Sequence, residues 1–317
     1  MADTPEADPG WERKIVEKLA LEALAEQRRR RRWGIFFKLL GFAYLTFLIV
    51  ALGDGGDTAE KLADGKKYTA LVQVNGVIKA NSEASAEKVN EALQAAFKDR
   101  GTQGVVLRIN SPGGSPVQSG IINDEIRRLR AKHPDIPLYA VVEDIAASGG
   151  YYIAAAADRI YVDKASIVGS IGVLMDGFGF TGAMDKLGVE RRLLTAGENK
   201  GFLDPFSPQD AMHKQHAQLL LDDIHQHCIE VVRKGRGKRL KESPELFSGL
   251  MWTGARSVEL GLADDLGSVE YVAREVIKAE TIRDYTMRAS LTERFARQFG
   301  TDMAEGLINA FGKLGLK

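Results

Sequence analysis

The most constraining feature of the sequence is an apolar stretch near its start. Residues 33–52 read WGIFFKLLGFAYLTFLIVAL and carry a single charge, at Lys38. A helix needs about 20 mostly apolar residues to cross a bilayer. A lysine near the end of such a helix can extend its amine to the headgroups. We therefore expect residues 33–52 to form one transmembrane helix.

The charges on either side of this stretch predict its orientation. Arg28–Arg32 are five consecutive arginines directly before it, whereas Gly53–Asp57 after it carry no positive charge. The positive-inside rule places the arginine side in the cytoplasm and the following chain outside. A cleavable signal peptide stays open as an alternative, because Ala51-Leu52-Gly53 resembles a cleavage site. A nucleic-acid patch at the arginines is disfavoured, since 43 basic residues are balanced by 43 acidic ones.

The rest of the chain alternates between strand and helix patterns. A Gly- and Asp-rich linker over residues 53–67 leads into it. Short apolar runs predict strands at residues 68–78, 105–109, 138–142, 160–162, 171–174 and 191–195, with helical spacing at 89–97, 117–129 and 149–157. This alternation predicts an α/β domain with a largely parallel sheet.

From about residue 207 the pattern is mainly helical, with one long helix near 208–234. We assign the folded domain to residues 68–280. Residues 1–32 are assigned to a cytoplasmic segment and residues 281–317 to an amphipathic helical tail.

Three glycine-marked turns each follow a predicted strand, at the end of a parallel sheet where sites usually form. The first is Asn110–Ser115 (NSPGGS), whose backbone N–H groups are open to an anion or a developing oxyanion. The second is Ala146–Gly150 (AASGG), which places the hydroxyl of Ser148 at a strand-to-helix turn. The third is Gly169–Gly172 (GSIG). Each signal is weak alone, because most Gly-Gly turns are only turns.

A serine nucleophile needs a base, and the sequence offers two kinds. Four of the five histidines, His213, His216, His225 and His227, fall on the long helix without an HExxH pattern. That spacing favours a surface helix over a metal site, although a histidine triad stays open. The other candidate is Lys200, in a loop with apolar neighbours, because a desolvated lysine amine can accept a serine proton.

Two further patterns exclude other classes of site. No GxxxxGK[ST] or strand-associated GxGxxG is present, which argues against nucleotide binding. Cys228 is the single cysteine, so an intrachain disulfide is excluded. We expect its thiol to pack in the core, since it lies in a patterned helical run.

Several segments together resemble the signal peptide peptidase A family of bacterial membrane peptidases, whose core fold is shared with ClpP and the crotonases. The segments that carry the resemblance are VNGVI (74–78), INSPGGS (109–115), DIAASGGYYIA (144–154), VGSIGV (168–173), GENK (197–200), DPF (204–206), TGAR (253–256) and LGLAD (260–264). Their order and spacing over about residues 68–280 make the resemblance specific. It implies a ClpP/crotonase-like parallel-sheet core with a helical C-terminal part.

The resemblance also implies a role for individual residues. Ser148 matches the nucleophile and Lys200 the general base, while Ser170 matches a hydroxyl that orients the lysine amine. Gly114, with Gly113 as an alternative, and the N–H of Gly149 would form the oxyanion hole. The short members of the family are homo-oligomers whose sites are completed by adjacent subunits. We therefore expect that Ser148 and Lys200 need not hydrogen-bond within one chain.

The resulting hypothesis is a membrane-anchored serine endopeptidase with a Ser-Lys dyad and no cofactor, metal or nucleic-acid partner. We expect it in the bacterial inner membrane, with its N-terminus cytoplasmic and its catalytic domain periplasmic. Its substrates would be remnant signal peptides or other peptides of the cell envelope, cut beside small apolar side chains. The alternatives are a crotonase-like acyl-CoA enzyme and a non-catalytic, membrane-tethered oligomeric scaffold.

Overall fold

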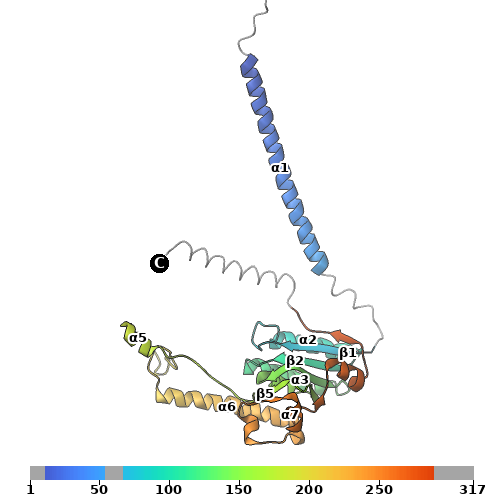
Figure 1. Ribbon diagram of the computed structural model, residues 1–317, viewed down its shortest axis with the longest axis vertical. Coiled ribbons are helices and arrows are strands. Elements are labelled where there is room, and N and C mark those ends of the chain that lie inside the picture. The colour runs from blue at the N-terminus through green and yellow to red at the C-terminus, as the bar shows by residue number, and fades with distance from the viewer. Residues whose placement is uncertain (1–10, 54–66, 289–317) are drawn as a thin grey trace, which may run out of the picture. The chain divides into compact units, whose positions relative to one another are not determined.

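The computed structural model describes residues 11–53 and 67–288. The chain divides into two compact units, residues 65–289 and the remainder at both ends. The described part of the terminal unit is one helix, α1 (Trp11–Gly53), blue in Figure 1. None of the helices in the described ranges combines the length and apolar character that crossing a membrane requires. The transmembrane helix expected at 33–52 therefore stays a prediction, and most of the expected linker lies outside the described residues.

The central unit is built on an eight-stranded sheet. The order of its main path is β6-β5-β3-β2-β1-β8, with β4 beside β3 and β7 beside β4. The strands are β1 (Tyr68–Asn75), β2 (Thr102–Ser111), β3 (Leu138–Ala147), β4 (Arg159–Val162), β5 (Ile167–Gly169), β6 (Met251–Thr253), β7 (Asp265–Leu266) and β8 (Ile282–Asp284). The pairs are parallel except β5 with β6. This confirms the α/β fold with a mostly parallel sheet.

Alternate residues of the central strands enter two apolar cores on opposite faces of the sheet. Val72 of β1 lies in the larger core with α2 (Ala86–Lys98), α3 (Pro116–Lys132) and α4 (Gly149–Ala154). Its neighbour Leu71 lies in a smaller core with α8 (Val269–Tyr271) and the following π-helical turn η4 (Val272–Ile277). Burial on both faces is why these strands are continuous apolar runs in the sequence.

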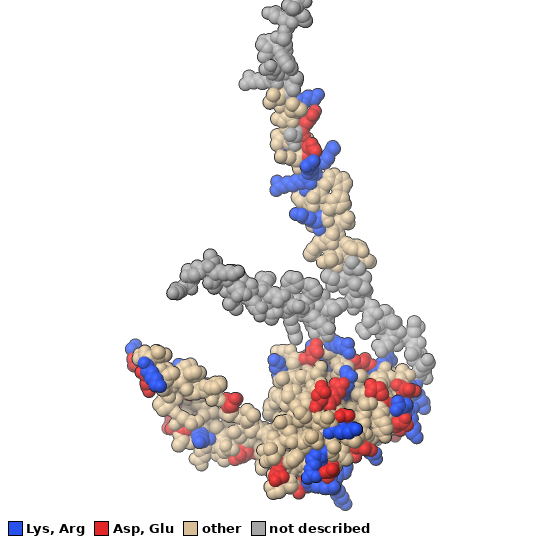
Figure 2. Space-filling view, in the orientation of Figure 1, with Lys and Arg blue, Asp and Glu red and all other residues tan. Residues whose placement is uncertain are grey.

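A long excursion leaves the sheet after β5. Residues 173–210, which we call the arm, contain the short helix α5 (Thr181–Leu187) and lead into α6 (Ala211–Arg236). The arm and the start of α6 extend away from the sheet (Figure 1). Large apolar side chains on the arm are exposed, including Leu174 at 81%, Phe178 at 80% and Leu194 at 97%. In Figure 2 its visible surface is mostly uncharged.

The structure has no strand at residues 171–174, where the arm begins, or at residues 191–195 within the arm, so those predictions are wrong. An apolar run becomes a strand only where a neighbour accepts its backbone hydrogen bonds, and the arm lies away from the sheet.

The C-terminal part packs back on the sheet through short elements. They are the 3-10 turns η2 (Gly237–Arg239) and η3 (Pro244–Phe247), strand β6 and α7 (Gly254–Glu259), followed by β7, α8 and η4. Strand β8 then pairs with β1, with Ala70 opposite Arg283. The helical tail expected at residues 281–317 is therefore wrong at residues 282–284, which form strand β8. Three residues are too few to show the alternation of apolar and polar side chains that marks a strand in a sequence. Residues 289–317 lie outside the described residues.

Candidate active site

Ser148 and Ser170 lie side by side because of strand register. Strand β3 ends at Ala147 and β5 at Gly169, and these two residues are paired partners in the parallel ladder. The residue that follows each strand is a serine, so the two hydroxyls leave adjacent strands at the same edge of the sheet. This is the carboxyl edge, where ligands of parallel sheets bind.

Both serines have an unusual backbone conformation. Ser148 has φ 51° and Ser170 has φ 50°, in the left-handed region that side-chain-bearing residues seldom adopt. The Ser148 N–H donates to Gly169 O at 2.8 Å, and the Ser170 N–H donates to Leu250 O at 2.7 Å. These bonds hold the two serines in this conformation. Such a conformation costs on the order of 1–3 kcal/mol and is concentrated at functional sites. A strained strand-to-helix turn is also how the nucleophilic serine is presented in the α/β-hydrolases.

The Pro-Gly-Gly turn lies directly against Ser148. Ile78 bridges this turn in parallel: its N–H donates to Gly113 O at 2.9 Å, and its carbonyl accepts from the Ser115 N–H at 2.8 Å. The residue between two such bonds directs its own N–H to the opposite side, so the Gly114 N–H faces away from Ile78. The Gly113 N–H instead donates to Ser111 Oγ at 3.2 Å. Of the two glycines, Gly114 is therefore the better oxyanion donor.

The close approach of this turn explains its glycines. A Cβ on Gly114 would lie 2.1 Å from Ile78 O, and one on Gly113 would lie 2.8 Å from both Ser148 Cβ and Gly149 N. A Cβ on Gly149 would lie 2.4 Å from Ser119 Oγ and 3.4 Å from Gly114 N. Gly114 and Gly149 thus lie close together beside Ser148. Their role as an oxyanion hole stays a prediction.

A small pocket opens next to Ser148. Its volume is about 210 Å³ including the mouth, and it is lined by Ser148, Tyr151, Tyr152, Ile171, Gly172, Cys228 and Val232. The lining is mainly apolar, and its polar groups include the Ser148 hydroxyl. Cys228 is half-buried against the core, as expected, but it also forms part of this wall. Burial raises the pKa of the Cys228 thiol.

A buried ion pair supports the helix that follows Ser148. Tyr151 of α4 donates its hydroxyl to Leu262 O at 2.7 Å, and burial raises its pKa. Two residues further, Asp264 accepts from Arg236 Nη1 at 2.8 Å and from the Ile160 N–H at 2.7 Å. Burial by itself would raise the pKa of Asp264, but these donors and the guanidinium charges of Arg236 and Arg239 hold it below the ordinary value.

Lys200 lies on the arm, and its side chain is exposed. Its N–H closes a turn to Gly197 O at 3.1 Å. Within the described residues, no hydrogen bond joins Lys200 to Ser148 or Ser170. The structure therefore brings Ser148, Ser170, Gly114 and Gly149 together in one chain, but it does not bring Lys200 to them.

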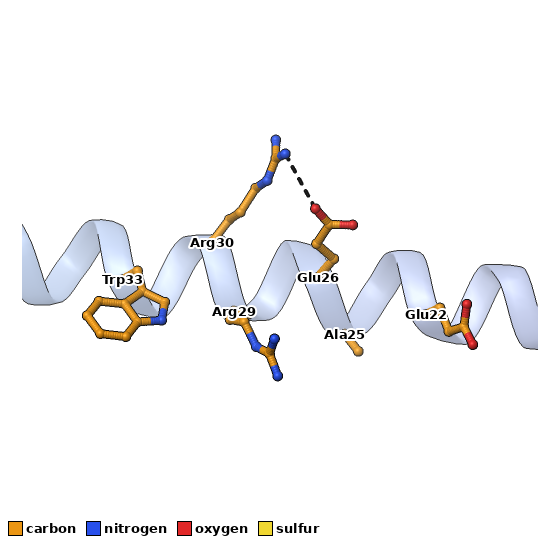
Figure 3. Close-up of a pocket in the computed structure, with 6 residues that line it drawn as sticks. All are labelled: Glu22, Ala25, Glu26, Arg29, Arg30 and Trp33. Atoms are coloured by element: carbon orange, nitrogen blue, oxygen red, sulfur yellow. Dashed lines mark ion pairs between the residues drawn. The ribbon is translucent and has the colours of Figure 1, made fainter.

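A second hollow lies along α1 and has no features of a catalytic site. It is lined by Glu22, Ala25, Glu26, Arg29, Arg30 and Trp33. Figure 3 shows that all six belong to one helix and that Arg29 and Arg30 point to opposite sides of it. Arg30 pairs with Glu26 at 3.4 Å, an exposed contact one helical turn apart. Such surface pairs contribute little to stability.

Comparison with known proteins identifies the family of this chain. The model of Peptidase family S49 matches residues 130–283, which include Ser148, Ser170 and Lys200. A protein of Enterococcus faecium named "Putative signal peptide peptidase SppA" is 33% identical over 73% of this chain and 69% of its own length. A protein of Methanocaldococcus jannaschii named "Putative protease MJ0651" is 33% identical over 89% of this chain and 88% of its own. The chain belongs to peptidase family S49.

Other similar proteins are much longer than the matched region. A Brucella melitensis protein named "Na(+)/H(+) antiporter NhaA" is 49% identical over 56% of this S49 chain, but the match spans only 24% of that protein. The corresponding Brucella abortus protein is 47% identical, with 25% of its length matched. The chain thus spans about a quarter of these relatives, and their name transfers no activity to it.

Some residues around the site are not signalled by the sequence. Leu250 positions Ser170 through its carbonyl alone, and His225 Nε2 lies 3.2 Å from Ile171 O. A backbone carbonyl leaves no trace in a sequence motif. The histidines of α6 have a helical spacing that indicates only a surface, and their partners lie on distant segments.

Proposed function

We propose that this chain is a serine peptidase in which Ser148 attacks the peptide carbonyl and Lys200 is the general base. The amine of Lys200 accepts the Ser148 proton, and the amides of Gly114 and Gly149 stabilise the oxyanion of the tetrahedral intermediate. Lys200 then protonates the leaving amine, which yields an acyl-enzyme. The amine next activates a water that hydrolyses the ester on Ser148. An oxyanion donor of this kind contributes about 3–4 kcal/mol to the barrier.

The observation that carries this proposal is the convergence at the end of β3. A strained serine, the serine that follows β5 and two glycines in close approach lie at the same edge of the sheet. This is the set that acyl transfer needs apart from the base. Membership of S49 supports peptides as the acyl donors.

We further propose that a second copy of the chain delivers Lys200. Lys200 is exposed on an arm whose apolar side chains are unburied, and such contiguous apolar surface marks an interaction site. Burying the arm against a neighbour would also desolvate the lysine amine, which favours its neutral, basic form. A homo-oligomer would thus assemble the dyad from the serine of one subunit and the lysine of the next.

The substrate class follows from the pocket and the predicted anchor. We propose that the pocket beside Ser148 receives a small apolar side chain of the substrate, because it is small and its lining includes Tyr151, Tyr152 and Val232. We propose that residues 33–52 anchor the chain in the bacterial inner membrane, with the peptidase unit on the periplasmic side. Remnant signal peptides and other peptides of the cell envelope meet both conditions.

A cleavage assay tests the proposal. The full chain in detergent is incubated with a synthetic signal peptide, and the products are identified by mass spectrometry. Cleavage after small residues is expected from the wild type and from Lys186→Ala, a control on the same arm. Ser148→Ala and Lys200→Ala should each be inactive. Intact peptide with an assembled wild type would refute the function, and so would cleavage that survives Ser148→Ala.

A further inference from the structure

In the loop that carries Lys200, residues on both sides of the lysine contact the start of α6. Before the lysine, Asn199 Oδ1 lies 3.1 Å from His213 Nε2. After it, the ring of Phe202 packs edge-on against His213 at 5.3 Å and against His216 at 5.6 Å between centroids. Lys200 is therefore bracketed by two residues that contact the same face of one helix.

His213 is itself firmly placed. Asp210 caps α6, and its Oδ1 accepts from the N–H groups of Met212 at 2.7 Å and His213 at 3.0 Å. The helix then runs for 26 residues back to the sheet. At that end Val232 and Cys228 line the Ser148 pocket, and Val232 is buried in the main core. Helix α6 thus fixes the position of His213 relative to the core of its own subunit.

Beyond Leu203 the chain is also tied to the segment around α5, where the Phe180 N–H donates to Pro205 O at 2.8 Å and Arg191 pairs with Asp204 at 3.3 Å. Around Lys200 itself the backbone bonds are short-range turns, such as the Phe202 N–H to Asn199 O at 3.1 Å, and Lys200 is exposed. Leu203 adopts φ 52°, a conformation that is unfavourable for leucine without outside support. The contacts of Asn199 and Phe202 with His213 are the ones that tie the residues on both sides of Lys200 to α6.

The hydrogen bond fixes which ring nitrogen carries the proton. The side-chain oxygen of Asn199 only accepts, so His213 must carry a hydrogen on Nε2. The contact requires a hydrogen-bond donor on the His213 ring, not a charge.

We propose that His213 is a positioning residue for the general base. It holds Asn199 and Phe202 and thereby sets the direction in which Lys200 is presented to the nucleophile. This inference rests on the proposed Ser-Lys function. Displacing a base by about 1 Å lowers the rate on the order of 100-fold. The contacts of His213 can therefore affect the rate of the reaction even though His213 touches no reacting atom.

The test measures the reaction of the full-length, detergent-solubilised chain with a fluorophosphonate probe. The maximal labelling rate constant and the half-saturating probe concentration are determined separately. His213→Ala should lower the rate constant by about 10- to 100-fold with little change in half-saturation. His213→Gln, which retains an N–H donor, should restore most of the rate. His227→Ala, an exposed histidine of the same helix, is the matched control and should label like the wild type.

A double variant separates positioning from general damage. If the two residues act as one unit, Asn199→Ala and His213→Ala together should lose no more than His213→Ala alone. Thermal melting and oligomeric state should match the wild type in all variants. Labelling of His213→Ala at the wild-type rate would overturn the inference, as would failure of His213→Gln to recover. A wild type that never labels would instead refute the proposed function.

Discussion

Replacing Asp264 by asparagine should destabilise the peptidase unit severely, although the two side chains have nearly the same shape. Asp264 is the acidic partner of Arg236, whose side chain is only 1% exposed. The asparagine oxygen can still accept from the Ile160 N–H, but the Arg236 guanidinium keeps its charge and loses its counter-charge. Breaking a buried pair by removing one partner costs about 3–5 kcal/mol. That is a large part of the roughly 5–15 kcal/mol by which a domain is usually stable.

The assay is thermal unfolding of the full chain followed by circular dichroism. For a unit of this size each kcal/mol lowers Tm by about 2–4 °C, so Asp264→Asn should lower it by about 6–20 °C. Asp265→Asn, at the neighbouring exposed carboxylate, is the control and should change Tm little. A loss below about 2 °C, or an equal loss at Asp265, would refute the reasoning.

The same ion pair predicts a pH dependence with a definite sign. The pKa of Asp264 lies below its ordinary value of 3.8 in the folded chain. The carboxylate therefore stabilises the fold fully above that ordinary value, and its contribution is lost as pH falls through the lowered folded pKa. The Tm gap between wild type and Asp264→Asn should be constant near neutral pH and close only in acid. A gap that closed between pH 8 and 6 would contradict this assignment.

Three further predictions concern the site. Gly114→Ala should lower the rate of peptide cleavage by about 10²- to 10³-fold, because its Cβ would meet Ile78 O at 2.1 Å and displace the turn that carries the Gly114 amide. Gly120→Ala, whose Cβ would make only an ordinary contact at 3.8 Å with the Tyr152 hydroxyl, is the control and should not, and equal rates would exclude an oxyanion role. Co-expressed Ser148→Ala and Lys200→Ala chains should regain up to about a quarter of wild-type cleavage in mixed oligomers, whereas no recovery would mean that each dyad forms within one chain. Iodoacetamide at pH 8 should alkylate native Cys228 at least about tenfold more slowly than a free thiol, because burial raises its pKa; equal rates by mass spectrometry would contradict that burial.

Much of the sheet could be read from the sequence because its strands are buried on both faces. Val105–Ile109 and Leu138–Val142 are short apolar runs of the length that is typical of strands buried on both faces. Both predicted strands are confirmed. The runs in the arm have a similar composition, yet no strand neighbours them. Pairing partners are a property of the fold, so composition alone could not separate the two cases.

The candidate site was predictable in its residues but not in its geometry. The motif around Ser148 marks a strand-to-helix turn, and its glycines mark close approach. The adjacency of Ser170, however, follows from the pairing of Ala147 with Gly169, and the direction of the Gly114 amide follows from the bridge at Ile78. The contacts of His213 with the loop that carries Lys200 join two segments whose sequences share no pattern that would predict the contact. Such long-range contacts are decided by packing.

The central claim is that Ser148 is a nucleophile activated by Lys200. It is tested most directly by treating the full chain in detergent with a fluorophosphonate and mapping the adduct by peptide mass spectrometry. The account predicts one adduct, on Ser148, that is absent from Lys200→Ala and retained in Lys186→Ala. An adduct on another residue, or one on Ser148 that forms as fast in Lys200→Ala, would contradict it.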